Sequence, residues 1–177
     1  MLDGNAFPIP VTVNLTQDEV PSNIRPLPDD GETPDMTPIY GKNCNDNGPG
    51  ARSIAGRWFT WTNRRDTAAI DLTVTGYATG TGAARFKDLV NDTGRCRWVT
   101  PKVPVSAVGL SGDGVWAGMG HSPQMGALGH AAIRYGDVII GVSVRDRQST
   151  PRAAAALAKR LVQLAADRSH DQIPQAR

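Results

Sequence analysis

The order of elements within residues 66–165 most restricts what this chain can fold into. Strict alternation over 69–75 predicts a strand with Ile70, Leu72 and Val74 on its buried face and with Asp71, Thr73 and Thr75 pointing outward. A helical apolar stripe over 82–92 predicts a short helix that is ended by Gly94. A Gly-rich span, a tight hairpin at Gly136-Asp137 and an Ala-rich helix over 151–167 follow. This mixture predicts one α+β domain with a mainly antiparallel sheet of five to seven strands, flanked by at least two helices.

The hairpin at Gly136-Asp137 sets the register of two strands. A two-residue Gly-Asp turn suits tight hairpins and places Tyr135 opposite Val138. The alternation on both sides then predicts one buried face, made of Ala131, Ile133, Tyr135, Val138, Ile140, Val142 and Val144. It predicts that His130, Arg134 and Ser143 share the opposite face.

Other segments carry start or strand signals. Residues 57–62 are rich in aromatic and β-branched side chains, so we expect them to form a hairpin with the strand at 69–75. Weaker strands are predicted at 103–110 and 115–117. The second helix begins with Thr150 as N-cap and Pro151 in its first turn.

The chain divides by composition into three parts: a Pro-rich acidic arm (1–43), a single α+β domain (44–168) and a tail (169–177). The arm holds seven of the 13 prolines, which block helix, so we expect it to be extended, strapped across the body or partly disordered. Within it, residues 11–15 alternate and could pair as an edge strand.

Charge is placed unevenly. Residues 1–42 carry seven acids and two bases, whereas the remainder has 17 bases and 10 acids. A mildly basic body suits contact with anionic envelope lipids or polymers, although Arg-rich codon usage balanced by an acidic arm explains the same numbers. The bases are scattered and match no nucleic-acid motif, so we expect no nucleic-acid partner.

No run approaches the ~20 apolar residues of a transmembrane segment, and residues 1–20 show no signal peptide.

The two cysteines, Cys44 and Cys96, have no second Cys or His at metal-ligand spacing, so we expect neither zinc nor a cofactor. Cys44 lies in a polar turn where a free thiol would be exposed, which favours pairing. A Cys44–Cys96 disulfide would close a loop of about 53 residues and stabilise the fold by about 4 kcal/mol. It would also indicate an oxidising compartment.

The best candidate for a binding surface is the Gly-rich span 109–129. Its seven glycines leave large side chains uncovered, and the predicted ligand-binding residues are Trp116, Met119, His121 and Met125. Such a surface suits an apolar or amphipathic ligand. The alternative is a flexible meander in which Trp116 and the methionines fill gaps in the core. A copper site of two Met and one His is not supported, because the spacing matches no compact ligand set.

Two catalytic alternatives are weaker. Ser111 or Ser122 with Asp113 and His121 could form a hydrolytic set, which would make the chain an envelope hydrolase, but a triad depends on geometry and the usual motifs are missing. The Gly-rich loop at 79–85 follows a strand and opens a helix, as a dinucleotide loop does. Arg85 replaces the third glycine and no parallel βαβ unit follows, so its glycines are expected to loosen a turn.

The sequence of strand, helix, Gly94-Arg95-Cys96, Gly-rich strands, the run 134–142 and an Ala-rich final helix resembles a group of actinobacterial cell-envelope proteins. The group includes secreted lipoproteins and the extracellular sensor domain of a receptor serine/threonine kinase, and the resemblance covers about 55–167. It implies a twisted antiparallel sheet flanked by helices, with a cleft between them. This chain departs from the kinase sensor by having cysteines for one disulfide where that domain has two.

The resemblance also implies a function. We expect a non-enzymatic, extracytoplasmic binding or sensor domain of the cell envelope, with an unidentified envelope ligand or protein as its partner. The chain is expected to be a monomer, tethered to the membrane, if at all, through an N-terminal signal or anchor that has been removed.

Overall fold

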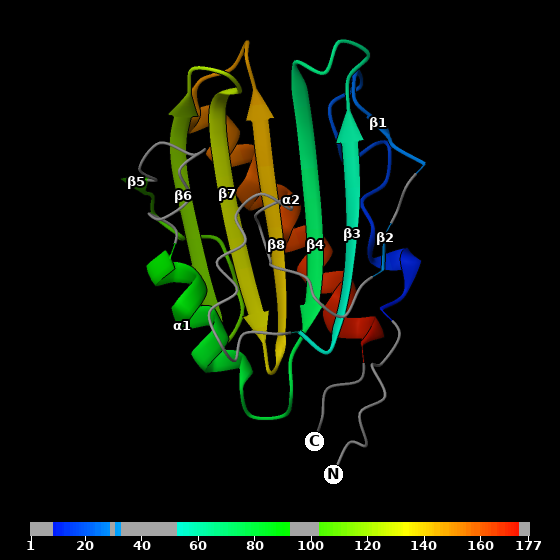
Figure 1. Ribbon diagram of the computed structural model, residues 1–177, viewed down its shortest axis with the longest axis vertical. Helices are drawn as coiled ribbons and strands as arrows, with labels where there is room; N and C mark the ends of the chain where they lie inside the picture. The colour runs from blue at the N-terminus through cyan, green and yellow to red at the C-terminus, as the bar shows by residue number, and fades with distance from the viewer. Residues whose placement is uncertain (1–8, 29–30, 33–52, 93–102, 174–177) are drawn as a thin grey trace.

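The computed structural model describes residues 9–28, 31–32, 53–92 and 103–173 (Figure 1). Eight strands form one sheet in the order β1-β3-β4-β8-β7-β6-β5, with β2 paired to β3, and every pairing is antiparallel. Five strands are long: β3 (Ala55–Thr62), β4 (Ala68–Gly76), β6 (Gly114–Ser122), β7 (Gly126–Tyr135) and β8 (Val138–Asp146). Three have two residues each: β1 (Arg25–Pro26), β2 (Gly31–Glu32) and β5 (Val103–Pro104). The predicted α+β class is confirmed.

Two helices lie on opposite faces of this sheet (Figure 1). Helix α2 (Pro151–Gln172) packs across the face that we call the inner face, where it shares the main apolar core with β3, β4, β7 and β8. Helix α1 (Gly82–Asp92) lies on the opposite, outer face and forms a smaller cluster there with Trp116, Ala132 and Ile139. The inner face is therefore mainly apolar, although Arg57 on β3 and His121 on β6 also lie on it, and the outer face has its own, smaller apolar contact.

The predicted hairpins are confirmed. Tyr135 pairs with Val138, and β3 pairs with β4 from Ala55–Gly76 to Thr62–Ala69. Gly136 takes φ +54°, a left-handed conformation that glycine adopts without steric cost. The predicted strands at 103–110 and 115–117 differ in length from those observed, since β5 has only two residues and β6 has nine.

Helix α2 begins as predicted. Thr150 Oγ1 accepts a hydrogen bond of 3.2 Å from Ala153 N–H, and Pro151 occupies the first turn. The helix ends at Gln172 rather than 167, so its last turn includes residues assigned to the tail. Ser169 and Ile173 are both buried, so the extra turn packs against the core instead of projecting into solvent.

Helix α2 approaches β7 unusually closely at Gly129. A Cβ atom on Gly129 would lie 2.1 Å from the carbonyl carbon of Ala154 and 2.3 Å from the amide nitrogen of Ala155. Both neighbours are helix backbone, which cannot move aside as a flexible side chain can. Glycine is therefore required here by packing, not by backbone conformation.

The described part of the N-terminal arm is packed, and the predicted edge strand at 11–15 is wrong. Residues Val11–Val13 form a short 3-10 helix, η1, beside α2. Five apolar side chains of this segment belong to the main core: Ile9, Val13, Leu15, Val20 and Ile24. Apolar burial at these positions overrides the strand signal of local alternation.

An ion pair fastens the arm to α2. Arg168 donates to the Glu19 carboxylate, and Arg160 donates to the Glu19 backbone carbonyl at 2.8 Å. Burial alone would raise the pKa of the Glu19 carboxyl, but hydrogen bonds from Thr16 and Arg168 outweigh it and the pKa is lowered.

Some expectations concern residues outside those described. Cys44 and Cys96 both lie there, so their disulfide stays a prediction, and so does the predicted helix end at Gly94. Among the described residues, neither helix is long and apolar enough to cross a membrane.

Gly129→Ala should destabilise the fold by at least about 3 kcal/mol, because the added methyl group would force α2 away from the sheet. Urea unfolding measures this. Ala156→Gly, at an exposed interior position of α2, is the matched control and should cost about 1 kcal/mol through helix propensity alone. A Gly129→Ala protein as stable as the control variant would contradict the close packing.

Glu19→Gln should cost about 1–2 kcal/mol at pH 7, as expected for a lost charge-assisted hydrogen bond. Since the folded pKa of Glu19 lies below its ordinary 4.5, its stabilisation is complete above that value and is lost as the pH falls through the folded pKa. The stability difference between wild type and Glu19→Gln, measured by urea unfolding, should therefore shrink below about pH 4. A difference that stays constant down to pH 2 would contradict the assignment.

Candidate functional site

The four predicted ligand-binding residues do not converge on one surface. Trp116 lies on the outer face, 8% exposed, in the cluster with α1. Met119 and His121 occupy alternate positions on the other face of β6, where Met119 pairs with Gly129. Met125 follows in the turn after β6, where its backbone amide donates a hydrogen bond to Ser122 Oγ at 3.3 Å. Strand alternation therefore separates Trp116 from its three predicted partners.

The hydrolytic set does not assemble either. His121 and Ser122 are successive residues of β6, so their side chains point to opposite faces, and Ser122 is buried. Asp113 lies at the other end of β6, roughly 26 Å from His121 at the usual rise per residue. There its carboxylate accepts from Gly136 N–H at 2.7 Å and pairs with Arg134. These residues serve turns and strand ends.

The Gly-rich loop before α1 binds the carboxylate of Asp137 from the same chain. The amides of Gly80 and Gly82 donate to the two carboxylate oxygens of Asp137, at 2.8 and 2.7 Å. A Cβ on Gly82 would lie 2.5 Å from Asp137 Cα. The amides that could cradle a phosphate thus fasten α1 to the β7–β8 hairpin, which agrees with a structural role for these glycines.

A row of polar side chains crosses the outer face, and it is the candidate functional site. The register places four residues side by side on adjacent strands: Thr60 on β3, Asp71 on β4, Ser143 on β8 and His130 on β7. Thr60 Oγ1 donates to Asp71 Oδ1 at 2.9 Å, and Ser143 Oγ lies 2.9 Å from His130 Nδ1. We call these four residues the polar row.

Burial within the polar row is graded. His130 is only 2% exposed, whereas Thr60, Asp71 and Ser143 are half-buried, so the row can be reached from solvent on the β3–β8 side. Asp71 was expected to point outward to solvent together with Thr73 and Thr75. All three lie on the outer face as predicted, but the two threonines are buried.

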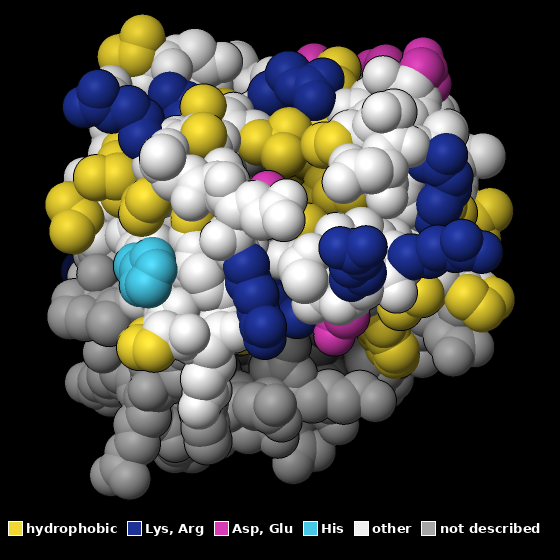
Figure 2. All heavy atoms as spheres, turned by 90° about the horizontal axis from the view of Figure 1, so that it is seen from above, with side chains coloured by type: hydrophobic (Ala, Val, Ile, Leu, Met, Phe, Trp, Pro, Cys, Tyr) yellow, Lys and Arg dark blue, Asp and Glu magenta, His cyan; other side chains and the backbone are white. Residues whose placement is uncertain are grey.

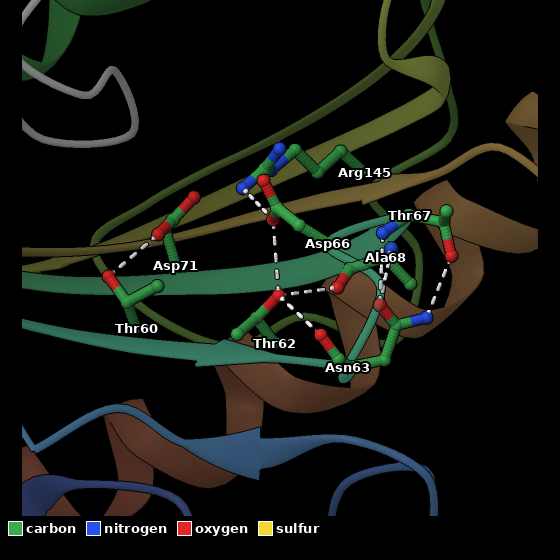
Figure 3. Close-up of polar contacts among 8 residues, drawn as sticks. All are labelled: Thr60, Thr62, Asn63, Asp66, Thr67, Ala68, Asp71 and Arg145. Carbon is green, nitrogen blue, oxygen red and sulfur yellow. Dashed lines mark hydrogen bonds and ion pairs between the residues drawn. The ribbon is translucent and has the colours of Figure 1, made fainter.

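Burial raises the pKa of the Asp71 carboxyl above its ordinary 3.8, and the hydrogen bond from Thr60 and the charge of Arg145 only partly offset this. Figure 3 shows Arg145 beside Asp66 on the same side of the β3–β4 ribbon as Asp71. Arg145 pairs with Asp66 at 3.0 Å, so its charge is shared between two carboxylates. Asp71 therefore carries its charge at a cost.

Apolar and very small residues border the polar row. The next row on the same face includes Trp58, Gly141 and Trp116, and the row itself continues from His130 to Gly118 on β6. Tryptophan rings beside a few polar groups are typical of sites for small ligands. In the part of the chain that the structure describes, no three His, Cys, Asp or Glu side chains gather as a metal site would require.

The sequence contained part of the signal for this site. His130 and Ser143 were predicted to share a face, which the register confirms. Their meeting with Asp71 depends on β4 pairing with β8, two strands more than 60 residues apart in the chain, and no local pattern specifies that pairing.

Comparisons with known proteins bear on the fold. No protein-family model matches the chain, and no curated protein matches it in sequence. Among solved structures, the chain is similar to the extracellular domain of PknH from Mycobacterium tuberculosis, with a TM-score of 0.60 and 12% sequence identity. The match covers 91% of this chain and 94% of that domain. The protein therefore has the fold of an extracellular domain of the kind that the sequence resemblance had indicated.

Proposed function

We propose that the protein is an extracytoplasmic binding or sensor domain of the cell envelope that recognises its ligand on the outer face of the sheet. The observation that carries this proposal is the polar row, in which a half-buried carboxylate with a raised pKa lies beside a Ser–His pair. The fold shared with an extracellular domain supports the extracytoplasmic setting.

The cost of Asp71 supports a functional role for the polar row. Burying a carboxylate destabilises a fold unless its partners compensate fully. Here Thr60 supplies one hydrogen bond, and Arg145 is already paired with Asp66. Groups held in a costly state by the surrounding fold are concentrated at binding and catalytic sites.

The chemistry of the outer face indicates the class of ligand. Trp58, which is half-buried, offers flat apolar surface, and the polar row adds hydroxyl, imidazole and carboxylate groups that can donate or accept hydrogen bonds. This combination suits an amphipathic molecule with an apolar portion and a polar head. If the ligand instead binds on the inner face, Met119, His121 and Met125 would form a separate site beside the turn between β6 and β7.

The remaining features of the proposal are its setting and assembly. We infer a monomer whose Cys44–Cys96 disulfide forms in an oxidising compartment. A membrane tether would act through an N-terminal signal or anchor.

Asp71→Asn should stabilise the protein by about 0.5–1 kcal/mol at pH 7, because the amide keeps an acceptor for Thr60 without the buried charge. The folded pKa of Asp71 is raised, so the charge lowers wild-type stability as the pH rises from about 3.8 through the folded pKa. Thermal unfolding should therefore show the largest gain for Asp71→Asn above that range and almost none at pH 3. A loss of stability at pH 7 would contradict a costly charge.

Variants on the two faces of the sheet should separate the two ligand sites. A ligand identified by a thermal-shift screen of envelope amphiphiles should bind about tenfold more weakly to Ser143→Ala and to Trp58→Phe, which is about 1.4 kcal/mol for each variant. Met119→Ala and His121→Ala, on the other face of β6, are the controls and should change the Kd less than twofold by calorimetry. The reverse pattern would place the ligand on the inner side and refute the proposed site.

A further inference from the structure

One end of the molecule is strongly basic. We call it the basic end and define it by residues 25–27, 62–68 and 145–152, which lie together where β3 and β8 end and α2 begins (Figure 1). It holds six arginines against two aspartates: Arg25, Arg64, Arg65, Arg145, Arg147 and Arg152, with Asp66 and Asp146. Figure 2 looks down on this end and shows Lys and Arg side chains spread across its described surface.

Both aspartates of the basic end are already engaged. Asp66 pairs with Arg145, and Asp146 Oδ1 accepts from the Gln148 amide at 2.8 Å. Elsewhere in the described part of the chain, three arginines pair with acids: Arg85 with Asp88, Arg134 with Asp113 and Arg168 with Glu19.

Five of the six arginines of the basic end have no acidic partner. Arg25, Arg64, Arg65, Arg147 and Arg152 are all exposed, and their guanidinium groups form no ion pair within the part of the chain that the structure describes. Unmatched positive charge is thus concentrated on β1, two neighbouring loops and the first turn of α2.

A groove of about 630 Å³ opens beside these charges. Arg25, Arg64 and Arg65 line it, together with Asn23, Pro26, Leu27, Thr62 and Asn63. The Arg25 guanidinium is oriented by the carbonyl oxygens of Ser22 and Ile24.

The loop that carries Arg64 and Arg65 is held in shape. Asn63 Nδ2 donates to Thr67 Oγ1 at 2.8 Å, and Asn63 Oδ1 accepts from Thr67 N–H at 2.9 Å (Figure 3). Binding an anion here would therefore cost little loop ordering.

We infer that the basic end binds an extended, phosphate-bearing polyanion, with part of its chain in the groove. Arginine matches phosphate oxygens with two parallel hydrogen bonds, which a lysine ammonium cannot do. The charges are spread across the ends of β1, β3, β4 and β8, which are successive strands of the sheet. Three strand spacings amount to roughly 14 Å, which is farther than a single phosphate reaches, so a polymer can satisfy them all.

A membrane surface fits less well. Proteins that lie on a bilayer usually insert large apolar side chains among the lipids. Of the exposed large apolar residues described, only Leu27 belongs to the basic end, and this side chain, 41% exposed, forms part of the groove wall. The loop tips themselves are polar.

Binding of fluorescently labelled inorganic polyphosphate, followed by anisotropy at low salt, tests the inference. The double variants Arg64→Gln/Arg65→Gln and Arg147→Gln/Arg152→Gln should each weaken binding at least tenfold. The control Arg85→Gln/Lys87→Gln removes the same charge from α1 and should change the Kd less than threefold. Equal weakening by all three variants would mean that only net charge matters, which would overturn the site.

Two further probes test the chemistry of the partner. Poly-glutamate of matched charge should bind at least tenfold more weakly than polyphosphate, and phosphatidylglycerol vesicles should bind more weakly per phosphate. Equal binding of poly-glutamate would overturn the preference for phosphate. Tighter binding of the vesicles would identify the basic end as a lipid-docking surface and overturn the polymer proposal. All these variants should bind a ligand of the polar row as tightly as the wild type does. This inference can therefore fail while the proposed function stands.

Discussion

The close approach of α2 to β7 at Gly129 is the contact on which the rest of the structure depends. It brings helix backbone to van der Waals distance of the strand and lets a helix rich in small side chains lie flat on the sheet. Ala154, Ala158 and Ala165 are fully buried in this layer. This packing, together with the apolar side chains of the N-terminal segment, fills most of the inner face with close-packed apolar groups.

Closure of the inner face gives the outer face a different role. There α1 covers only part of the sheet, and the polar row lies beside that cover. One layer supplies most of the apolar burial that stabilises the fold, and the other can hold a costly carboxylate and a Ser–His pair. The basic end adds a third surface at the rim, built from loops that the sheet and α2 hold in place.

Local patterns in the sequence were enough for much of the fold. The Gly136-Asp137 hairpin, helix α1 and the start of α2 follow from turn chemistry, an apolar stripe and an N-cap, and all three are where they were predicted. The 3-10 helix at Val11–Val13 and the extra turn of α2 were missed, because burial against distant residues decides them.

The candidate site was harder to predict. Trp116 was chosen because glycines surround it, but strand alternation sends it to the face opposite Met119 and His121. Asp71 was assigned to solvent because it alternates with apolar residues, a pattern that identifies a face but not what else lies on it. The polar row is formed by strand order, and strand order is a long-range property that periodicity does not contain.

The central claim is that the inner face stabilises the fold and the outer face recognises the ligand. The most direct test is a map of backbone amide chemical shifts by NMR as a bound amphiphile is titrated in. The account predicts that the shifts concentrate at Thr60, Asp71, His130, Ser143 and their neighbours, while the buried positions of α2 stay unchanged. Shifts concentrated on α2, or on Met119 and His121, with the polar row unperturbed, would contradict it.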